Sequence, residues 1–182
     1  MTRKDQSSPV EPGTTVKGAS RAGGKSRALY TAEERVRRDE SVWTIVQGVL
    51  APLQFLVFLI SLGLVLRTLT TGEGAFAADV SVVIKTLVLY TIMITGSIWE
   101  KVVFGKWLFA ESFFWEDVFS MLVLALHTLY LVLLFGGYGT LEQRMLVALA
   151  GYGAYVINAG QFIWKLRMAR LEGAHSRTAV TA

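Results

Sequence analysis

The pattern of apolar and polar positions divides the chain into four long hydrophobic segments joined by short connections. The segments span residues 42–66, 80–104, 113–135 and 141–166. A helix needs about 20 apolar residues to cross the roughly 30 Å hydrocarbon core of a bilayer, and each segment has about that length. Short connections make consecutive helices antiparallel neighbours. The pattern therefore predicts an all-α integral membrane protein, a bundle of four transmembrane helices.

The flanking regions are polar and predict three further parts. Residues 1–28 are basic and rich in Gly, Ser and Thr, so we expect a disordered tail. Residues 29–41 predict an amphipathic helix at the membrane interface, because Thr31 and Glu34 have the spacing of a capping box. The bundle occupies residues 42–168, and residues 169–182 predict a second disordered tail.

One stretch of the first tail resembles a phosphate-binding loop. Residues 19–26 read "ASRAGGKS", which fits a relaxed form of that motif. A working loop needs a strand before it and a helix after it, and the surrounding sequence predicts neither. We therefore interpret the stretch as part of a solvated basic tail.

Composition agrees with a membrane protein and narrows the chemistry. The chain of 182 residues is 53% hydrophobic and contains no cysteine, and its mean hydropathy is +0.47. Without cysteine there are no disulfides, thiolate nucleophiles, iron–sulfur clusters or cysteine-ligated zinc. We expect the lipid bilayer as a partner and no nucleic acid.

The distribution of positive charge predicts how the bundle is oriented. Nine of the 18 Lys and Arg residues precede residue 40 and four follow residue 164, whereas residues 70–79 and 136–140 contain none. Cytoplasmic segments carry the excess of Lys and Arg in membrane proteins. Both termini and the connection after residue 104 are therefore predicted to face the cytoplasm.

Polar side chains collect near the cytoplasmic ends of the predicted helices. They come from all four segments and are predicted to share one layer, comprising Gln47, Glu100, Glu116, Asp117, Asn158 and Gln161. Ionisable groups at membrane depth are costly unless they face the bundle interior or water, so they suggest a functional site. The alternative is interfacial, since acids at helix ends also favour the helix dipole and reach headgroup water.

A histidine lies deeper on the same helix face as one of the acids. Glu116, Ser120 and His127 fall on one stripe, with a rise of about 16 Å from the first to the last at 1.5 Å per residue. His127 could hydrogen-bond between helices or ligate the metal of a tetrapyrrole. A two-histidine haem site within the chain is excluded, because the other histidine, His175, lies in the C-terminal tail.

Aromatic residues crowd the same end of the bundle. Trp99 and Trp115 belong to this group, which also includes Trp43, Trp107, Phe113, Phe114 and Trp164. Such residues are typical of the interfacial aromatic belt of membrane proteins. Alternatively, they would form a stacking wall for a large planar ligand.

Four stretches of the chain closely resemble the 3-vinyl bacteriochlorophyllide hydratase family of bacteriochlorophyll biosynthesis. They read "SVWTIVQGVLAPLQFLVFLISLGLVLR", "SVVIKTLVLYTIMITGSIWEKVVFGKWLFA", "FFWEDVFSMLVLALHTLYL" and "YVINAGQF", within residues 29–170. The resemblance implies a membrane lyase that adds water to the C3 vinyl group of chlorophyllide a or 3-vinyl bacteriochlorophyllide a. It also implies the bacterial inner (intracytoplasmic) membrane and contact with other bacteriochlorophyll-synthesis enzymes.

Vinyl hydration requires an acid, a positioned water and a dry planar site, and no redox cofactor. We predict Glu116 or Asp117 as the general acid, with the other or Glu100 holding the water. His127 would ligate the substrate magnesium or relay a proton, and the protein would hold no metal of its own. Further predicted substrate contacts are Ser120, Asn158, Gln161, Gln47, Trp99 and Trp115.

Two other functions remain open from the sequence. A non-catalytic pigment-binding or assembly protein of the photosynthetic membrane would use the histidine and the aromatic residues but would not need the carboxylates. A small proton-coupled transporter would need polar groups through to the far side of the membrane. There the sequence offers little beyond Lys85, Tyr90 and Thr91.

Overall fold

The computed structural model describes residues 29–180, with side chains placed for residues 29–171. Its helices are α1 (Ala32–Glu40), α2 (Val42–Thr71), α3 (Ala75–Phe104), α4 (Phe114–Phe135) and α5 (Leu141–Val180). The last four are long and apolar enough to cross a membrane. The predicted all-α architecture with four spanning helices is confirmed, and the chain is a multi-pass membrane protein.

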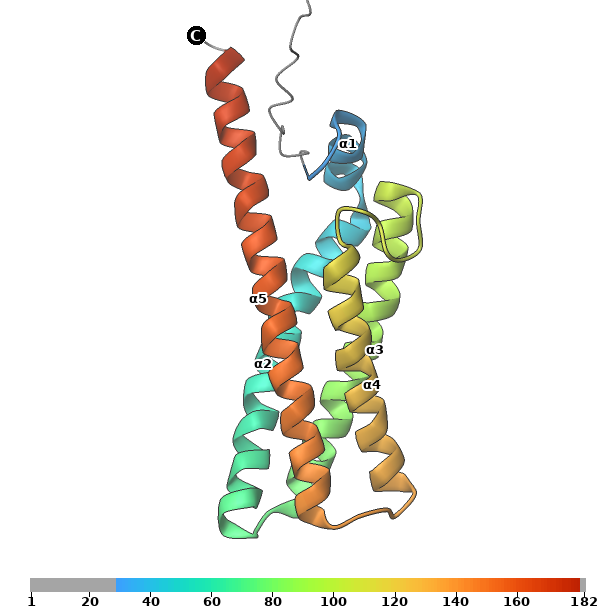
Figure 1. Ribbon diagram of the computed structural model, residues 1–182, viewed down its shortest axis with the longest axis vertical. Coiled ribbons are helices and arrows are strands. Elements are labelled where there is room, and N and C mark those ends of the chain that lie inside the picture. Colours follow the sequence, from blue (N-terminus) through green and yellow to red (C-terminus); the bar gives the residue numbers. More distant parts are fainter. Residues whose placement is uncertain (1–28, 181–182) are drawn as a thin grey trace, which may run out of the picture.

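The four long helices run side by side along the bundle axis (Figure 1). Helix α1, the α3–α4 loop and the C-terminal end of α5 lie at one end of the bundle, and the α2–α3 and α4–α5 loops lie at the other. The chain packs as two hairpins, α2 with α3 and α4 with α5. Large hydrophobic side chains such as Phe76 (83% exposed) and Phe135 (74% exposed) cover its outside. Lipid tails solvate such a surface, whereas water would not.

Helix α1 begins with the predicted capping box. The Glu34 backbone N–H donates to Thr31 Oγ1 at 3.2 Å, and the Thr31 N–H donates to Glu34 Oε2 at 2.7 Å. The helix is fixed against the end of α3 by Arg37, whose Nε donates to the Val103 carbonyl at 2.9 Å. The sequence thus correctly placed the start of this short helix.

The long helices extend beyond the apolar segments that predicted them. Helix α2 continues to Thr71 and ends where Gly72 adopts φ 74° and donates its N–H to the Thr68 carbonyl at 2.9 Å. Helix α3 begins at Ala75, five residues before the predicted start, and α5 continues to Val180 through the segment predicted to be a disordered tail. Helical hydrogen bonding does not stop where hydrophobicity falls, so apolar length underestimated these helices. The predicted basic tail, residues 1–28, lies outside the described residues.

A cluster of polar residues joins three helices at the end of the bundle farthest from α1. The Tyr130 hydroxyl donates to Asp79 Oδ1 at 2.5 Å, and Arg144 Nη2 lies 3.5 Å from Asp79 Oδ2. These residues come from α4, α3 and α5, and Tyr130 is fully buried. We call these three residues the opposite-end cluster. Because they connect α3 with α4 and α5, they fix the two hairpins to each other.

Candidate active site

Two buried carboxyl groups meet where α3 ends and α4 begins. The side chains of Glu100 and Asp117 interact electrostatically with each other and are only 5% and 4% exposed. Burial and the repulsion between two neighbouring negative charges both oppose ionisation of the second carboxyl group, so such a pair favours keeping one proton. The pair is therefore suited to hold a proton between the ends of two helices.

The loop between α3 and α4 fixes both carboxyl groups through backbone N–H groups. The Phe109 N–H donates to Asp117 Oδ2 at 2.7 Å, and the Ala110 N–H donates to Glu100 Oε2 at 3.3 Å. Phe109 has φ 58°. It is the only non-glycine residue with a positive φ among the residues that the structure describes. Such a backbone conformation is unfavourable for a bulky residue and is found most often at functional sites. The strained turn aims consecutive amides at the acid pair.

A third carboxyl group forms an ion pair across the interface of α4 and α5. Lys165 Nζ lies 2.5 Å from Glu116 Oε2, and Glu116 interacts electrostatically with its neighbour Asp117. The lysine ammonium also lies 5.0 Å from the centre of the Phe113 ring. We call Glu100, Glu116, Asp117 and Lys165 the acid cluster. It brings three acids and one cation together, so carboxyl groups exceed cations.

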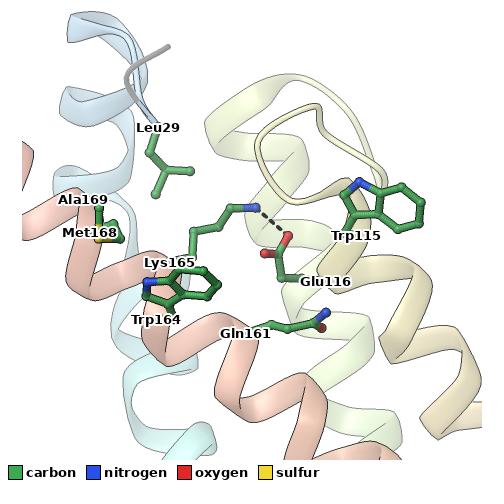
Figure 2. Close-up of a pocket in the computed structure, with 8 residues that line it drawn as sticks. All are labelled: Leu29, Trp115, Glu116, Gln161, Trp164, Lys165, Met168 and Ala169. Atoms are coloured by element: carbon green, nitrogen blue, oxygen red, sulfur yellow. Dashed lines mark hydrogen bonds and ion pairs between the residues drawn. The ribbon is translucent and has the colours of Figure 1, made fainter. Parts of the chain in front are cut away.

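An open cavity of about 480 Å³ is lined by Glu116 and Lys165 of the acid cluster, whereas Glu100 and Asp117 lie behind them and do not line it. Its volume falls within the roughly 300–1,000 Å³ of small-molecule sites. Figure 2 shows Trp115 from α4 and Trp164 from α5 on either side of the Glu116–Lys165 ion pair. The other lining residues are Leu29, Gln161, Met168 and Ala169. The two indoles are 66% and 71% exposed, so the cavity opens between apolar aromatic groups on the outside of the bundle.

Two of the predicted polar residues are hydrogen-bonded beneath this cavity. Asn158 Nδ2 donates to Ser120 Oγ at 2.8 Å, and both side chains are buried. Asn158 Oδ1 and Gln161 Oε1 are buried without a hydrogen-bond partner among the described residues. Since Gln161 also lines the cavity, α5 places an unpaired amide group next to the acid cluster.

Gln47 and Trp99, which were predicted to contact substrate, make their contacts elsewhere. Gln47 Nε2 donates to Thr95 Oγ1 at 2.8 Å, within the α2–α3 hairpin. Trp99 Nε1 donates to Thr44 Oγ1 at 2.9 Å, and its ring packs against Phe104 and Phe113. Neither residue lines the cavity. Both residues connect elements of the fold, and their predicted role in substrate binding stays a prediction.

His127 is buried in the bundle, as the stripe of Glu116, Ser120 and His127 predicted. It is 1% exposed, and its Nδ1 donates to the Val123 carbonyl of its own helix at 2.8 Å. Because a carbonyl only accepts, Nδ1 carries the proton and Nε2 has a free lone pair. That Nε2 has no hydrogen-bond partner within residues 29–171. His127 lines neither of the two cavities described in this chain, and its role as a magnesium ligand stays a prediction.

The sequence missed the partner of Glu116 and the amides that hold the acid pair. Lys165 entered the sequence analysis only as a charge that orients the bundle, yet it meets an acid 49 residues away. No local spacing signals such a contact, because it depends on how α4 and α5 pack. The described residues contain no group of three or more His, Asp or Glu side chains that could hold a metal ion.

Fold and site together define a small multi-pass membrane protein with a buried carboxyl pair next to an ion pair that lines an open cavity. Residues 30–168 match the family described as 2-vinyl bacteriochlorophyllide hydratase. The chain therefore belongs to the 2-vinyl bacteriochlorophyllide hydratase family, as its resemblance predicted. The numbers 2 and 3 denote the same vinyl position in two numbering schemes for the tetrapyrrole ring.

Two curated relatives carry the same name. The 2-vinyl bacteriochlorophyllide hydratase of Cereibacter sphaeroides is 68% identical over 146 residues, which cover 80% of this chain and 91% of the relative. The one of Rhodobacter capsulatus is 65% identical over 148 residues, covering 81% of this chain and 86% of the relative. No solved structure matches the chain.

Proposed function

We propose that this protein is a hydro-lyase that adds water to the C3 vinyl group of chlorophyllide a or 3-vinyl bacteriochlorophyllide a. The product carries a 1-hydroxyethyl group and belongs to bacteriochlorophyll biosynthesis. Its family membership supports the activity. The observation that carries the chemistry is the Glu100–Asp117 pair, because hydration of an alkene begins with a proton from a positioned acid.

The acid cluster contains the groups that each step needs. The Glu100–Asp117 pair gives its proton to the terminal vinyl carbon, which leaves a cation on the inner carbon that is stabilised by the conjugated macrocycle. Water held by Glu116 attacks that inner carbon, and the Glu116 carboxylate takes the proton that the water loses. The proton returns from Glu116 to its neighbour Asp117, so H and OH are added and the enzyme is restored. No redox cofactor takes part.

The cavity suits a flat, amphipathic pigment that approaches from the lipid. Trp115 and Trp164 would contact the faces of the macrocycle, and the Gln161 amide N–H₂ would donate to a ring carbonyl. Ser120 and Asn158 would support the site from beneath through their mutual hydrogen bond. His127 lies deeper, so a proton relay through its free Nε2 is a role that needs no contact with the ring.

We further propose that both termini and the α3–α4 loop face the cytoplasm, in the bacterial inner (intracytoplasmic) membrane. Lys101, Lys106, Lys165 and the three arginines of α1 belong to this end of the bundle, whereas the described residues of the other end include only the two arginines Arg67 and Arg144. Arg67 lies 3.8 Å from Glu73, and Arg144 lies 3.5 Å from Asp79. The excess of positive charge therefore favours a cytoplasmic position for the end that carries the acid cluster. The 1-hydroxyethyl product would pass to an oxidising enzyme of the same pathway.

Two fusion proteins test this orientation. A fluorescent reporter that matures only in the cytoplasm should be active when it is fused after Ala182. A phosphatase reporter that is active only outside the cytoplasm should be active when it is inserted at Gly137, in the α4–α5 loop. The reverse pattern of the two activities would overturn the orientation.

The activity itself is tested with membranes from a host that makes no bacteriochlorophyll but expresses this chain. The membranes are incubated with 3-vinyl bacteriochlorophyllide a or chlorophyllide a, with no added cofactor. We expect the pigment to gain the mass of one water and its red absorption band to move to shorter wavelength, because the vinyl group leaves conjugation. Unchanged pigment that co-purifies with the protein would instead indicate a binding or assembly role.

Variants connect the activity to the acid cluster. Asp117→Asn removes the acid but keeps an oxygen for the Phe109 N–H, so hydration should be lost while the protein remains folded. Glu142→Gln changes an exposed acid at the other end of the bundle and should leave the rate unchanged. If Asp117→Asn and Glu100→Gln both hydrate the pigment at the rate of the original protein, the acid assignment is wrong.

A further inference from the structure

Lys165 lies at the cavity in a position that the hydration chemistry does not require. Of the described residues that line the cavity, Lys165 is the one that carries a positive charge. Its side chain is 27% exposed. Its partner Glu116 is only 8% exposed, so the lysine is the more accessible member of the ion pair. Figure 2 shows the lysine reaching across from α5, with its ammonium directed toward Glu116. An acid needed only for catalysis would not require a cation at the mouth of the cavity.

The ammonium group of Lys165 has hydrogen-bonding capacity that the protein does not use. An ammonium carries three N–H donors, and one of them goes to Glu116 Oε2 at 2.5 Å. A second side of the group faces the Phe113 ring, whose centre lies 5.0 Å from Nζ. The remaining donor capacity is available to a group inside the cavity. A carboxylate is the ligand that such a cation binds most strongly in a partly apolar environment.

The proposed substrates carry one such group. A chlorophyllide is the free-acid form of the pigment, with an ionised propionate on an otherwise apolar macrocycle. The propionate and the C3 vinyl group sit on neighbouring pyrrole rings. In the protein, Lys165 contacts Glu116, and Glu116 adjoins Asp117 in the chain. A pigment held by its propionate at Lys165 therefore has its macrocycle next to the acid cluster.

Resting on the proposed function, we infer that Lys165 forms a carboxylate-binding subsite that selects the free-acid pigment over its esters. The Lys165 ammonium bridges Glu116 and the substrate propionate, and the ring lies between Trp115 and Trp164. An ester carries no charge and accepts a weaker hydrogen bond, so it loses this interaction. Charge-assisted hydrogen bonds commonly change affinity by about 10- to 100-fold, which sets the expected discrimination.

The test compares the free acid of the vinyl pigment with its methyl ester. We expect kcat/KM of the original protein to be about 10- to 100-fold higher for the free acid, mainly through KM. Lys165→Gln should treat the two pigments alike, whereas Lys165→Arg should keep most of the discrimination because it keeps the charge. The matched control is Arg170→Gln, which removes an exposed cation of α5 outside the cavity and should leave the discrimination unchanged.

The ratio of free acid to ester separates this inference from the proposed function. Lys165→Gln also removes the partner of Glu116, and this loss lowers the hydration rates of the free acid and the ester by the same factor. The ratio of the two rates therefore still reports the contact between Lys165 and the carboxylate. Hydration of both pigments at equal kcat/KM by the original protein would overturn the subsite and leave the hydratase intact. Discrimination that persists in Lys165→Gln would assign the carboxylate to another residue and overturn the inference as well.

A binding measurement keeps the inference testable without turnover. The corresponding pigment with an ethyl group at C3 cannot be hydrated, and its binding can be followed by quenching of tryptophan fluorescence from Trp115 and Trp164. Its free acid should bind about 10- to 100-fold more tightly than its methyl ester to the original protein, and equally to Lys165→Gln. If neither vinyl pigment is hydrated but this difference in binding appears, the proposed activity fails and the carboxylate subsite stands.

Discussion

The bundle places carboxyl groups among packed helices at both ends, half-buried at one end and buried at the other, but with different partners. In the opposite-end cluster, Asp79 receives the Tyr130 hydroxyl at 2.5 Å and lies 3.5 Å from Arg144, so one acid has one cation and one donor. In the acid cluster, Lys165 pairs with Glu116 and interacts with Asp117, whereas Glu100 interacts with Asp117. A balanced group at membrane depth holds helices together, whereas an excess of carboxyl groups retains a proton that chemistry can use. The cavity borders the unbalanced end.

The largest expected effect comes from removing an acid of the unbalanced end. Asp117→Asn and Glu100→Gln should each lower the hydration rate by about 10²- to 10⁴-fold, because a positioned general acid contributes that much. The measurement is the rate of the product's appearance per amount of folded protein. A loss below about tenfold in both variants would mean that the pair is structural, as the opposite-end cluster is.

The second effect concerns stability rather than rate. Asp79→Asn leaves Arg144 without its carboxylate and weakens the contact with Tyr130, so we expect a loss of about 1–3 kcal/mol in the free energy of unfolding. Thermal unfolding in detergent measures this loss. The hydration rate per folded molecule should be unchanged, and a large fall in that rate would contradict the contrast between the two ends.

A smaller loss of stability is expected between the two ends of the bundle, where Gly151 of α5 packs against His127. A Cβ at Gly151 would lie 2.9 Å from His127 Cε1 and 3.0 Å from Nδ1, whereas a Cβ at Gly153 would have nothing within 4 Å. Gly151→Ala should therefore destabilise the protein by about 1–2 kcal/mol through overpacking. Gly153→Ala is the matched control and should be neutral or stabilising, by up to about 1 kcal/mol, because alanine favours helices. Equal unfolding temperatures for the two variants would mean that the His127 ring moves freely aside.

The smallest effect is expected at Gln47, which lies in neither cluster. Gln47→Leu removes a hydrogen bond to Thr95, and such bonds between membrane helices average about 0.6 kcal/mol. Activity should stay within about twofold of the original protein, since Gln47 does not line the cavity. A strong rise in KM would restore Gln47 as a substrate contact, as the sequence predicted.

The sequence alone was sufficient for everything that depends on local periodicity. Apolar length predicted the four spanning helices, the spacing of Thr31 and Glu34 predicted the cap of α1, and helical periodicity predicted the buried stripe of Glu116, Ser120 and His127. These features follow from backbone hydrogen bonding and from the 3.6-residue repeat, which act over a few residues. Motif similarity likewise identified the family.

The tertiary structure decided which polar groups meet. The residues predicted to share one layer have different partners, because the rotation of each helix turned Gln47 toward Thr95 and Glu116 toward Lys165, 49 residues away. The strained turn at Phe109 supplied amides for the acid pair, a contact that no spacing encodes. Side-chain packing between helices fixes those rotations, and it sums many weak contacts across the whole bundle. The sequence therefore determined the elements and their chemistry, and only packing determined the site.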